Sequence, residues 1–409
     1  MSSENGIFTE AMLEEAAIEI LQSLDYDYAF GPDISLGGDY EERKDYREVI
    51  LSQRVKDALF KINRDLPMEA LDDAYRQLIT FNSPMLEENN RYFHQLMTEG
   101  IEVSFNEGGH IRTKRAYIID FENMSNNEFV VVNQFTIIEN EERRPDLIVF
   151  VNGLPLVVIE LKSASDENVG IDSAYNQIQT YKRDIPSLFN YNAFCILSDG
   201  INAKAGTITS NEEWFMNWRT ADGEDIAPLS QPQYEVLLNG MFQKERLLDI
   251  MHNFIIFQES KEPDKDIDGK KIGDKKSIIK ILAAYHQYFA VKKAIEKTKE
   301  ATKEDGDRKI GVIWHTQGSG KSFSMVFYTG GLVRELNNPT IVVITDRNDL
   351  DDQLFTTFTK SKDILRQTPK QATVRKLSDN QRTNYANGNS TEVNGLYDLL
   401  NDRESGGII

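Results

Sequence analysis

The apolar residues of the first half of the chain follow first a helical and then a strand-like pattern. Residues 11–22 place apolar side chains three and four positions apart, which predicts an amphipathic helix. Residues 48–104 are predicted to be mainly helical, with a Ser-Pro break at 83–84. Beyond residue 116 the pattern changes to short runs of β-branched and aromatic residues, at 116–121, 128–139, 146–151, 154–162 and 193–199, with one helical segment at 171–184. The first half is therefore predicted to be a mixed α/β domain built on a small sheet.

A charged segment separates this region from a second pattern. Residues 259–276 are almost all charged, Gly or Pro, which cannot bury a core and predicts a linker or exposed loop. We therefore place one domain at 1–258 and the start of a second at 277–409. The second is predicted to contain a helix (277–298) and then a buried strand, a Gly-rich turn, a helix, a buried strand and a helix between 309 and 358. This alternation is typical of parallel α/β domains, and the polar residues 360–396 are predicted to be a loop.

Composition narrows the class of protein. The chain has 409 residues, a net charge of −20 and a single cysteine, which excludes disulfide scaffolds and multi-cysteine zinc sites. It contains no run of 18 apolar residues and its first ten residues do not resemble a signal peptide, so we expect a cytoplasmic protein without a membrane span. The acidic balance argues against tight DNA binding by this chain alone, since phosphate contacts come from Lys and Arg. It does not exclude a local site or basic grooves on partner subunits.

A candidate phosphate-binding loop lies in the sequence KIGVIWHTQGSGKS, residues 309–322. A predicted strand at 310–314 leads into Gly318, Ser319 and Gly320, and a helix is predicted to start near Ser322. Small residues let main-chain N–H groups surround phosphates, and the helix N-terminus favours the negative charge. Lys321 would reach the β- and γ-phosphates of ATP, and the Ser322 hydroxyl would bind Mg²⁺.

One position departs from the usual phosphate-loop pattern, because His315 occupies the place of its first glycine. The alternative interpretation is an ordinary turn before a helix. Two neighbours support the nucleotide hypothesis. Gln287 resembles the glutamine with which superfamily 2 helicases read the adenine edge, although a lone helical glutamine is usually a surface residue. Arg347, after a predicted buried strand in residues 339–345, resembles a helicase motif that contacts the DNA backbone, or is an ordinary exposed loop residue.

A second candidate site comprises Asp146, Glu160 and Lys162. Asp146 opens one apolar run, Asn152-Gly153 is a strong hairpin signal, and the other two residues close the second run. Residues i and i+2 share one face of a strand, so Glu160 and Lys162 point the same way. A strict two-residue turn pairs residues whose numbers sum to 305 and turns Asp146 away from Glu160. A three-residue loop with a Gly bulge gives an even sum, such as 304, so the functional hypothesis predicts a bulged or three-residue turn.

This combination of side chains suits the hydrolysis of phosphodiesters. Two carboxylates can hold Mg²⁺, a cation that prefers oxygen ligands and lowers the pKa of bound water. Lys162 can orient the attacking water and neutralise charge on the phosphate. The alternative interpretation is that these charges merely protect a strand edge. Gln177 and Tyr181 form a weaker pattern, because residues i and i+4 share one helix face and could support the metal site or contact DNA.

Together these motifs resemble the R (motor and endonuclease) subunit of type I restriction enzymes. The resemblance rests on Asp146 with Glu160-Leu161-Lys162 as a PD-(D/E)xK motif, Gln177 with Tyr181 as the Q-x3-Y motif of the RecB-like branch, the 314–322 loop, and the early segment 13–34. It implies an α/β RecB-like nuclease domain followed by a partial RecA-like domain of the superfamily 2 helicase type. It also implies Mg²⁺ and ATP as cofactors, and double-stranded DNA and the methyltransferase (M) and specificity (S) subunits as partners. Glu14 would be an additional acidic residue near the metal, or a solvated helix carboxylate.

Two other functions are weighed against this one. The first is a nucleotide-binding assembly module with an inactive nuclease fold, which the intact Asp146, Glu160 and Lys162 disfavour. The second is a repair helicase–nuclease, which would more often carry its nuclease at the C-terminal end. No DEAD- or DEAH-like acidic run occurs in the 409 residues. We therefore expect this chain by itself to bind ATP at most weakly, without efficient hydrolysis or translocation.

Overall fold

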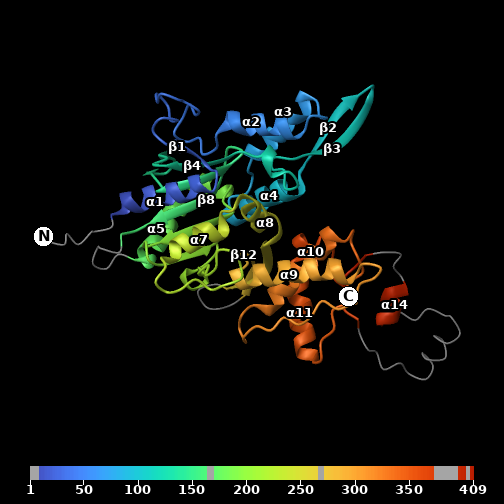
Figure 1. Cartoon of the computed structure of the whole chain (residues 1–409). Coiled ribbons are helices and arrows are strands. Elements are labelled where there is room, and N and C mark those ends of the chain that lie inside the picture. Colours follow the sequence, from blue (N-terminus) through green and yellow to red (C-terminus); the bar gives the residue numbers. More distant parts are fainter. Residues whose placement is uncertain (1–8, 164–169, 266–270, 373–394, 402–405) are drawn as a thin grey trace, which may run out of the picture. The chain divides into compact units, whose positions relative to one another are not determined.

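The computed structural model describes residues 9–163, 170–265, 271–372, 395–401 and 406–409. The chain divides into two compact units. One comprises Met1–Ile255 and Lys276–Tyr285, and the other comprises Ile256–Lys275 and His286–Ile409. Figure 1 shows the ribbon coloured along the sequence, with the sheet of the first unit in blue and green.

A six-stranded mixed sheet forms the centre of the first unit. Its strand order is β1-β4-β7-β8-β9-β10, with β1 parallel to β4, β8 parallel to β9, and every other pair antiparallel. Every residue of β7, β8 and β9 is buried, as expected for apolar runs covered on both faces. The prediction of a mixed α/β domain on a small sheet is thus confirmed. The strands span Asp27–Phe30, Phe129–Asn133, Leu147–Val151, Leu154–Leu161, Phe194–Ser198 and Ala203–Gly206.

Helices pack around this sheet where the sequence pattern predicts most of them. α1 (Glu10–Ser23) contacts β1, β4 and β8, and α5 (Ile171–Asp184) contacts β8 and β9 (Figure 1). The helical region predicted at 48–104 contains three separate helices, divided near the Ser-Pro break and at Leu66-Pro67. The remaining helices of this unit are α2 (Ser52–Ile62), α3 (Met68–Ile79), α4 (Leu86–Glu99), α6 (Pro186–Asn190), α7 (Gln233–Met241) and α8 (Lys244–Asn253).

A two-stranded hairpin was not predicted. β2 (Ile101–Glu107) pairs with β3 (His110–Ala116) over its whole length, around Gly108 and Gly109. Alternate β2 residues, Ile101, Val103 and Phe105, are buried, and β2 contacts α3. The helical prediction therefore extended too far, to residue 104, and the two-residue alternation in IEVSF is the signal that it missed. A second small sheet joins β5 (Ile137–Ile138) to β6 (Glu142–Arg143).

The charged segment 259–276 is not irregular throughout. β11 (Ile255–Lys265) and β12 (Lys271–Leu282) extend into it and form a two-stranded sheet. The helix predicted at 277–298 starts later as a result, because residues up to Leu282 belong to β12. The observed helix is α9 (Tyr285–Ala301).

The two buried strands predicted in the second unit are not formed. Residues 310–314 have no regular structure, and Val312 and Trp314 are 93% and 82% exposed. Within 339–345 only Ile341 makes a bridge, parallel, to Ile408. A buried parallel strand needs hydrogen-bonded neighbours and helices over both faces, and the described residues do not supply them here.

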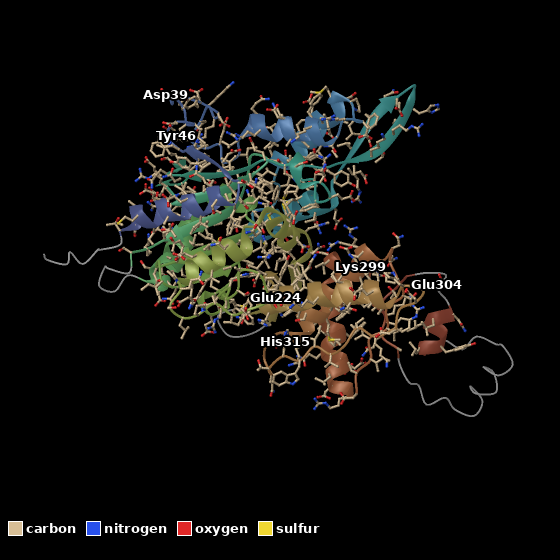
Figure 2. All side chains as sticks on the ribbon, viewed as in Figure 1. Asp39, Tyr46, Glu224, Lys299, Glu304 and His315 are labelled. Carbon is tan, nitrogen blue, oxygen red and sulfur yellow. The ribbon has the colours of Figure 1, made fainter. Side chains whose placement is uncertain are left out.

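The helices of the second unit lie close to their predicted places. α10 (Lys321–Glu335) begins one residue before the predicted start, and α11 (Asn348–Lys360) follows the 339–345 segment. α12 (Lys362–Leu365) occupies the beginning of the loop predicted at 360–396, whose greater part, 373–394, lies outside the described residues. α14 covers Leu396–Asn401. The Lys299 ammonium on α9 pairs with Glu335 on α10 at 2.8 Å, and Figure 2 labels Lys299.

Candidate functional site

The β7–β8 hairpin combines a two-residue turn with a bulge. Asn152 and Gly153 have φ angles of 52° and 77°, the left-handed backbone that a tight two-residue turn requires. Val151 pairs with Leu154, so the turn has the odd sum of 305, but Val149 pairs with Val157, and Leu147 with Ile159, at the even sum of 306. The extra residue is Leu156, next to Pro155, which lacks the N–H that a regular ladder would use.

This bulge sets the face to which Asp146 belongs. The last ladder pair is Leu147 with Ile159, and extending its even register by one residue sets Asp146 opposite Glu160, whereas the odd register of the turn would separate them. The predicted bulged or three-residue turn is therefore not formed: the turn has two residues, and a bulge inside the strand pair produces the even register instead. Its consequence is that the three polar residues at the end of the hairpin lie together.

Short contacts connect these residues. Lys162 Nζ lies 2.8 Å from Glu160 Oε1 and donates to the Leu161 carbonyl at 3.1 Å. Asp146 Oδ2 accepts a hydrogen bond of 2.7 Å from the Leu161 N–H. The Leu161 main chain therefore contacts both Asp146 and Lys162, a role that the sequence did not indicate.

Burial shifts the titration of both carboxyls. It raises the pKa of Asp146 to about 6, against the opposing effects of the Leu161 N–H and of Lys162. Burial, and next the charge of Asp146, raises the pKa of Glu160 to about 8. Burial alone would lower the pKa of Lys162, but the charge and hydrogen bond of Glu160, together with the charges of Asp146 and Glu10, outweigh it and raise the pKa. Two carboxyls held this close in a buried setting repel each other when both are ionised.

Glu160 has a buried oxygen without a partner. Its side chain is 1% exposed, and Oε2 makes no hydrogen bond. An unpaired buried carboxylate oxygen is costly, and a bound cation would satisfy it. Within the described part of the chain, no three His, Cys, Asp or Glu side chains are grouped closely enough to hold a metal by themselves. Two carboxylates still fit Mg²⁺, which commonly binds one or two carboxylates and keeps several waters.

Tyr181 and Gln177 of α5 also belong to this cluster. The Tyr181 hydroxyl donates to the Arg144 carbonyl at 3.3 Å and lies close enough to Glu160 to lower the pKa of that carboxyl. Burial, and next the charge of Glu160, raises the pKa of Tyr181, while Gln177 acts in the opposite direction through a side-chain hydrogen bond. The structure thus brings the i, i+4 pair to the carboxylates.

α1 supplies two further carboxylates, Glu10 and Glu14, of which only Glu14 was predicted. The charges of Glu14 and Glu10 both act to raise the pKa of Asp146, and Glu10 Oε1 lies 3.4 Å from Lys162 Nζ. Gln134 Nε2 donates to both oxygens of Glu14, at 2.9 and 3.0 Å. The spacing of Glu10 and Glu14 at i and i+4 could have predicted their shared face. No feature of the sequence marks Gln134.

The predicted phosphate-loop residues lie together in the second unit. Gly318 and Gly320 have φ angles of 82° and 75°, and Gly320 directly precedes α10. Gln287 Nε2 donates to the Gly320 carbonyl at 2.9 Å, so this α9 residue reaches the loop. Lys321 Nζ donates to the carbonyls of His315 and Thr316, at 3.0 and 2.8 Å.

The loop also carries groups that could turn toward phosphates. Ser322 lies in the first turn of α10, and the Ser319 carbonyl lies 3.1 Å from a ring nitrogen of His286. The His286 and His315 rings meet edge to face at 5.0 Å, and Figure 2 labels His315 on the segment before α10. A helix N-terminus after a Gly-rich turn is an anion-binding geometry. The guanidinium of the exposed Arg347 forms a 4.0 Å ion pair with the neighbouring Asp346.

The fold and these clusters define a class of protein. It is a mixed α/β protein with a buried carboxylate–lysine cluster on its central sheet and a phosphate-loop-like turn in a second unit. None of the helices in the described ranges combines the length and apolar character needed to cross a bilayer. Residues 7–214 match the family model "Type I restriction enzyme R protein N terminus", and residues 286–391 match the model of the SWI2/SNF2 ATPase. The first match covers half of the chain, which therefore belongs to the type I restriction enzyme R protein family.

Individual relatives agree with the family. The chain is 40% identical over 371 residues to the type I restriction enzyme HindI endonuclease subunit of Haemophilus influenzae, a match that covers 89% of this chain and 34% of the relative. It is 26% identical over 246 residues to the SauCOLORF180P endonuclease subunit of Staphylococcus aureus, covering 59% of this chain and 23% of that protein. The chain thus spans about a third or less of the length of these relatives.

Proposed function

We propose that this chain carries the nuclease and the beginning of the ATP-driven motor of a type I restriction enzyme. In this proposal residues 1–258 are a PD-(D/E)xK endonuclease domain that cleaves double-stranded DNA with Mg²⁺. Residues 277–409 begin a RecA-like translocase domain that binds ATP. The chain acts with methyltransferase and specificity subunits in the cytoplasm, and the complex cuts away from its recognition sequence.

One observation carries the nuclease proposal. The bulge at Leu156 shifts the pairing of β7 with β8: paired residue numbers sum to 305 beside the turn and to 306 beyond the bulge. Extended by one residue, this second register sets Asp146 opposite Glu160. A hairpin selected only for stability has no need to place two carboxylates face to face in a buried setting, where their repulsion is a cost. Such a cost is typical of functional sites.

Each residue has a distinct role in this proposal. Asp146 and Glu160 would hold Mg²⁺, with Glu14 as an additional acidic residue nearby, and the ion would acidify a bound water and stabilise negative charge on the scissile phosphate. Lys162, held by Glu160 at 2.8 Å, presents an ammonium that orients the attacking water and neutralises the developing charge. Tyr181 and Gln177 support Glu160 from α5 or contact the DNA backbone.

The nucleotide site is the second part of the proposal. Gly318, Ser319 and Gly320 would surround the phosphates of ATP, with Lys321 and Ser322 as the charged and hydroxyl ligands. Gln287 would read the adenine edge. Lys321 donates to carbonyls of its own loop in this structure, so binding phosphates requires its ammonium to exchange these for phosphate oxygens. The alternative remains an assembly module whose nuclease fold is inactive.

The test is nicking of supercoiled plasmid in Mg²⁺ by the complex reconstituted from the full-length subunit and its M and S partners. Asp146→Ala and Lys162→Ala should abolish nicking and leave ATP hydrolysis unchanged. Lys321→Ala, as the reciprocal variant, should abolish ATP hydrolysis. If nicking persists in both nuclease-site variants, the hairpin charges are structural and the nuclease assignment is wrong. If the unmodified complex hydrolyses ATP without nicking, the inactive-fold alternative holds.

A further inference from the structure

A glutamine outside every motif discussed above links β4 to the Glu14 carboxylate and to the main chain of Asp146. Gln134 directly follows β4, and its Nε2 donates to both oxygens of Glu14, at 2.9 and 3.0 Å. Its main-chain N–H donates to the Asp146 carbonyl at 3.3 Å. One residue therefore contacts a site carboxylate on α1 with its side chain and the Asp146 backbone with its main chain.

The backbone of Gln134 is held in a conformation that glutamine disfavours. Its φ angle is 54°, in the left-handed region that costs a non-glycine residue free energy. The surroundings fix it there. The Gly31 N–H donates to the Asn133 carbonyl at 2.9 Å, and a Cβ atom on Gly31 would lie 2.6 Å from the Gln134 carbonyl oxygen. Strain of this kind persists where the surrounding structure imposes it, and it is concentrated at functional sites.

Neighbouring polar groups extend the same contact. Asn133 Nδ2 donates to Glu14 Oε2 at 3.3 Å, and the Asn133 Oδ1 atom accepts from the Tyr28 hydroxyl at 3.0 Å. Glu14 is half-buried, and it lies near enough to Asp146 for its charge to raise the pKa of that carboxyl. Without these amide donors, an acidic side chain on α1 would turn away from a second carboxylate toward solvent.

We propose that Gln134 is a positioning residue that fixes the Glu14 carboxylate beside Asp146 and thereby strengthens divalent-cation binding. The inference rests on the proposed nuclease function and adds a residue to it. It predicts that Gln134 affects the affinity for the cation more than the maximal rate of cleavage, because residues behind the ligands of a metal alter its affinity by about 10–100-fold.

The test measures Mn²⁺ binding to the 409-residue chain by calorimetry, with Gln134→Gly as the main variant. Glycine accepts the left-handed backbone and removes the side chain together with its amide, and relief of the backbone strain should leave Tm unchanged or raise it. Mn²⁺ affinity should fall about tenfold. Asn337→Gly is the matched control, because Asn337 is exposed, has a φ angle of 53° and lies far along the chain in the other unit. It should bind Mn²⁺ as the unmodified chain does.

A double-mutant cycle with Glu14→Gln separates positioning from general destabilisation, whatever the Tm of the glycine variant. If Gln134 acts through Glu14, the double variant binds Mn²⁺ no more weakly than the weaker-binding single variant. In the reconstituted complex, Gln134→Gly should then raise the Mg²⁺ half-saturation for nicking and keep the maximal rate within about twofold. Additive losses, or unchanged Mn²⁺ affinity in Gln134→Gly, overturn the inference. Asp146→Asn distinguishes failure of this inference from failure of the proposed nuclease function. If Asp146→Asn also leaves Mn²⁺ affinity unchanged, the proposed metal site itself is wrong.

Discussion

The Oδ2 atom of Asp146 accepts a hydrogen bond of 2.7 Å from the main-chain N–H of Leu161. The acceptor belongs to the residue before β7 and the donor to the last residue of β8, so this bond joins the ends of the two strands. It orients Asp146 toward the strand end that carries Glu160 and Lys162. The bond also lowers the pKa of Asp146, but burial raises it more strongly, so the carboxyl remains costly to ionise in the folded chain.

Replacing Asp146 by Asn should therefore stabilise the chain in the absence of metal. The amide oxygen can still accept from the Leu161 N–H, and the charge that repels Glu160 is removed. Since burial raises the pKa of Asp146 to about 6, the gain at pH 8 should be roughly 1–3 kcal/mol, at 1.36 kcal/mol for each pKa unit. It should disappear below pH 4, where the Asp146 carboxyl is protonated in folded and unfolded chains alike.

The measurement is Tm at pH 8 and pH 3.5 in EDTA, with Asp39→Asn as the control. Asp39 is exposed and lies in the 31–51 loop region, as Figure 2 shows. A gain of the same size in both variants, or equal gains at both pH values, would contradict the idea that repulsion at the site is relieved.

Cation affinity should rise with pH between 6 and 8. A divalent cation binds ionised carboxylates, and the pKa values of Asp146 and Glu160 are raised to about 6 and about 8. Binding must then displace protons below pH 8. The Mg²⁺ half-saturation for nicking is expected to fall at least tenfold from pH 6 to pH 8, because one proton released corresponds to about tenfold per pH unit below the pKa. Calorimetry in buffers of different ionisation enthalpy gives the number of protons released. Zero release at pH 7 would mean that Glu160 does not bind the cation in ionised form.

The central sheet was predictable because its buried strands are continuous apolar runs with clear ends. An even register was predicted only conditionally, from the requirement that Asp146 and Glu160 share a face, and it was assigned to a bulged or three-residue turn instead of a bulge within the strands. Pro155 is the local feature that favours a bulge at this place. Glu10 and Gln134 escaped prediction for a different reason: their contacts span 152 residues to Lys162 and 120 residues to Glu14, and no local pattern encodes such distances.

In the second unit, the two strand predictions failed because strand formation depends on residues elsewhere in the chain. The apolar runs at 310–314 and 339–345 have the composition of buried strands, but a strand forms only where other strands supply hydrogen-bond partners. In the described ranges Ile341 bridges to Ile408, and 310–314 has no strand neighbour. The helix after the Gly-rich loop was predictable because its start depends on the adjacent glycine and not on distant partners.

Gly153 should tolerate alanine poorly. Its φ angle is 77°, and an added Cβ atom would lie 2.6 Å from the Leu51 carbonyl oxygen and 3.0 Å from the Val55 nitrogen. Both contacts are with main chain at the start of α2, which cannot rotate away. We expect Gly153→Ala to lower the free energy of unfolding by about 2–4 kcal/mol, combining left-handed strain of about 1 kcal/mol with a steric clash.

Gly109→Ala is the matched control, because Gly109 has a φ angle of 87° and open space around it. This variant should lose only the stability that corresponds to the left-handed strain. Equal losses of Tm in the two variants would show that crowding at Leu51 is unimportant.

Lys280 should make the stability of the first unit depend on pH in the alkaline range. The side chain is 2% exposed, and its Nζ donates to Asn90 Oδ1 at 2.9 Å and to the Asn192 carbonyl at 2.6 Å. Burial lowers the pKa of Lys280 to about 7. Between pH 7 and 10.5 the unfolded chain then binds more protons at this lysine than the folded chain, so its contribution to stability rises with pH and is lost as pH falls toward 7. The difference in unfolding free energy between the unmodified chain and Lys280→Met should change by about 2–4 kcal/mol in favour of the unmodified chain from pH 7 to pH 10.

The measurement is Tm of the unmodified chain and of Lys280→Met across this pH range, with the exposed Lys303→Met as the control. A difference that stays constant with pH would mean that Lys280 keeps its proton in the folded chain and that its surroundings hold a buried ammonium.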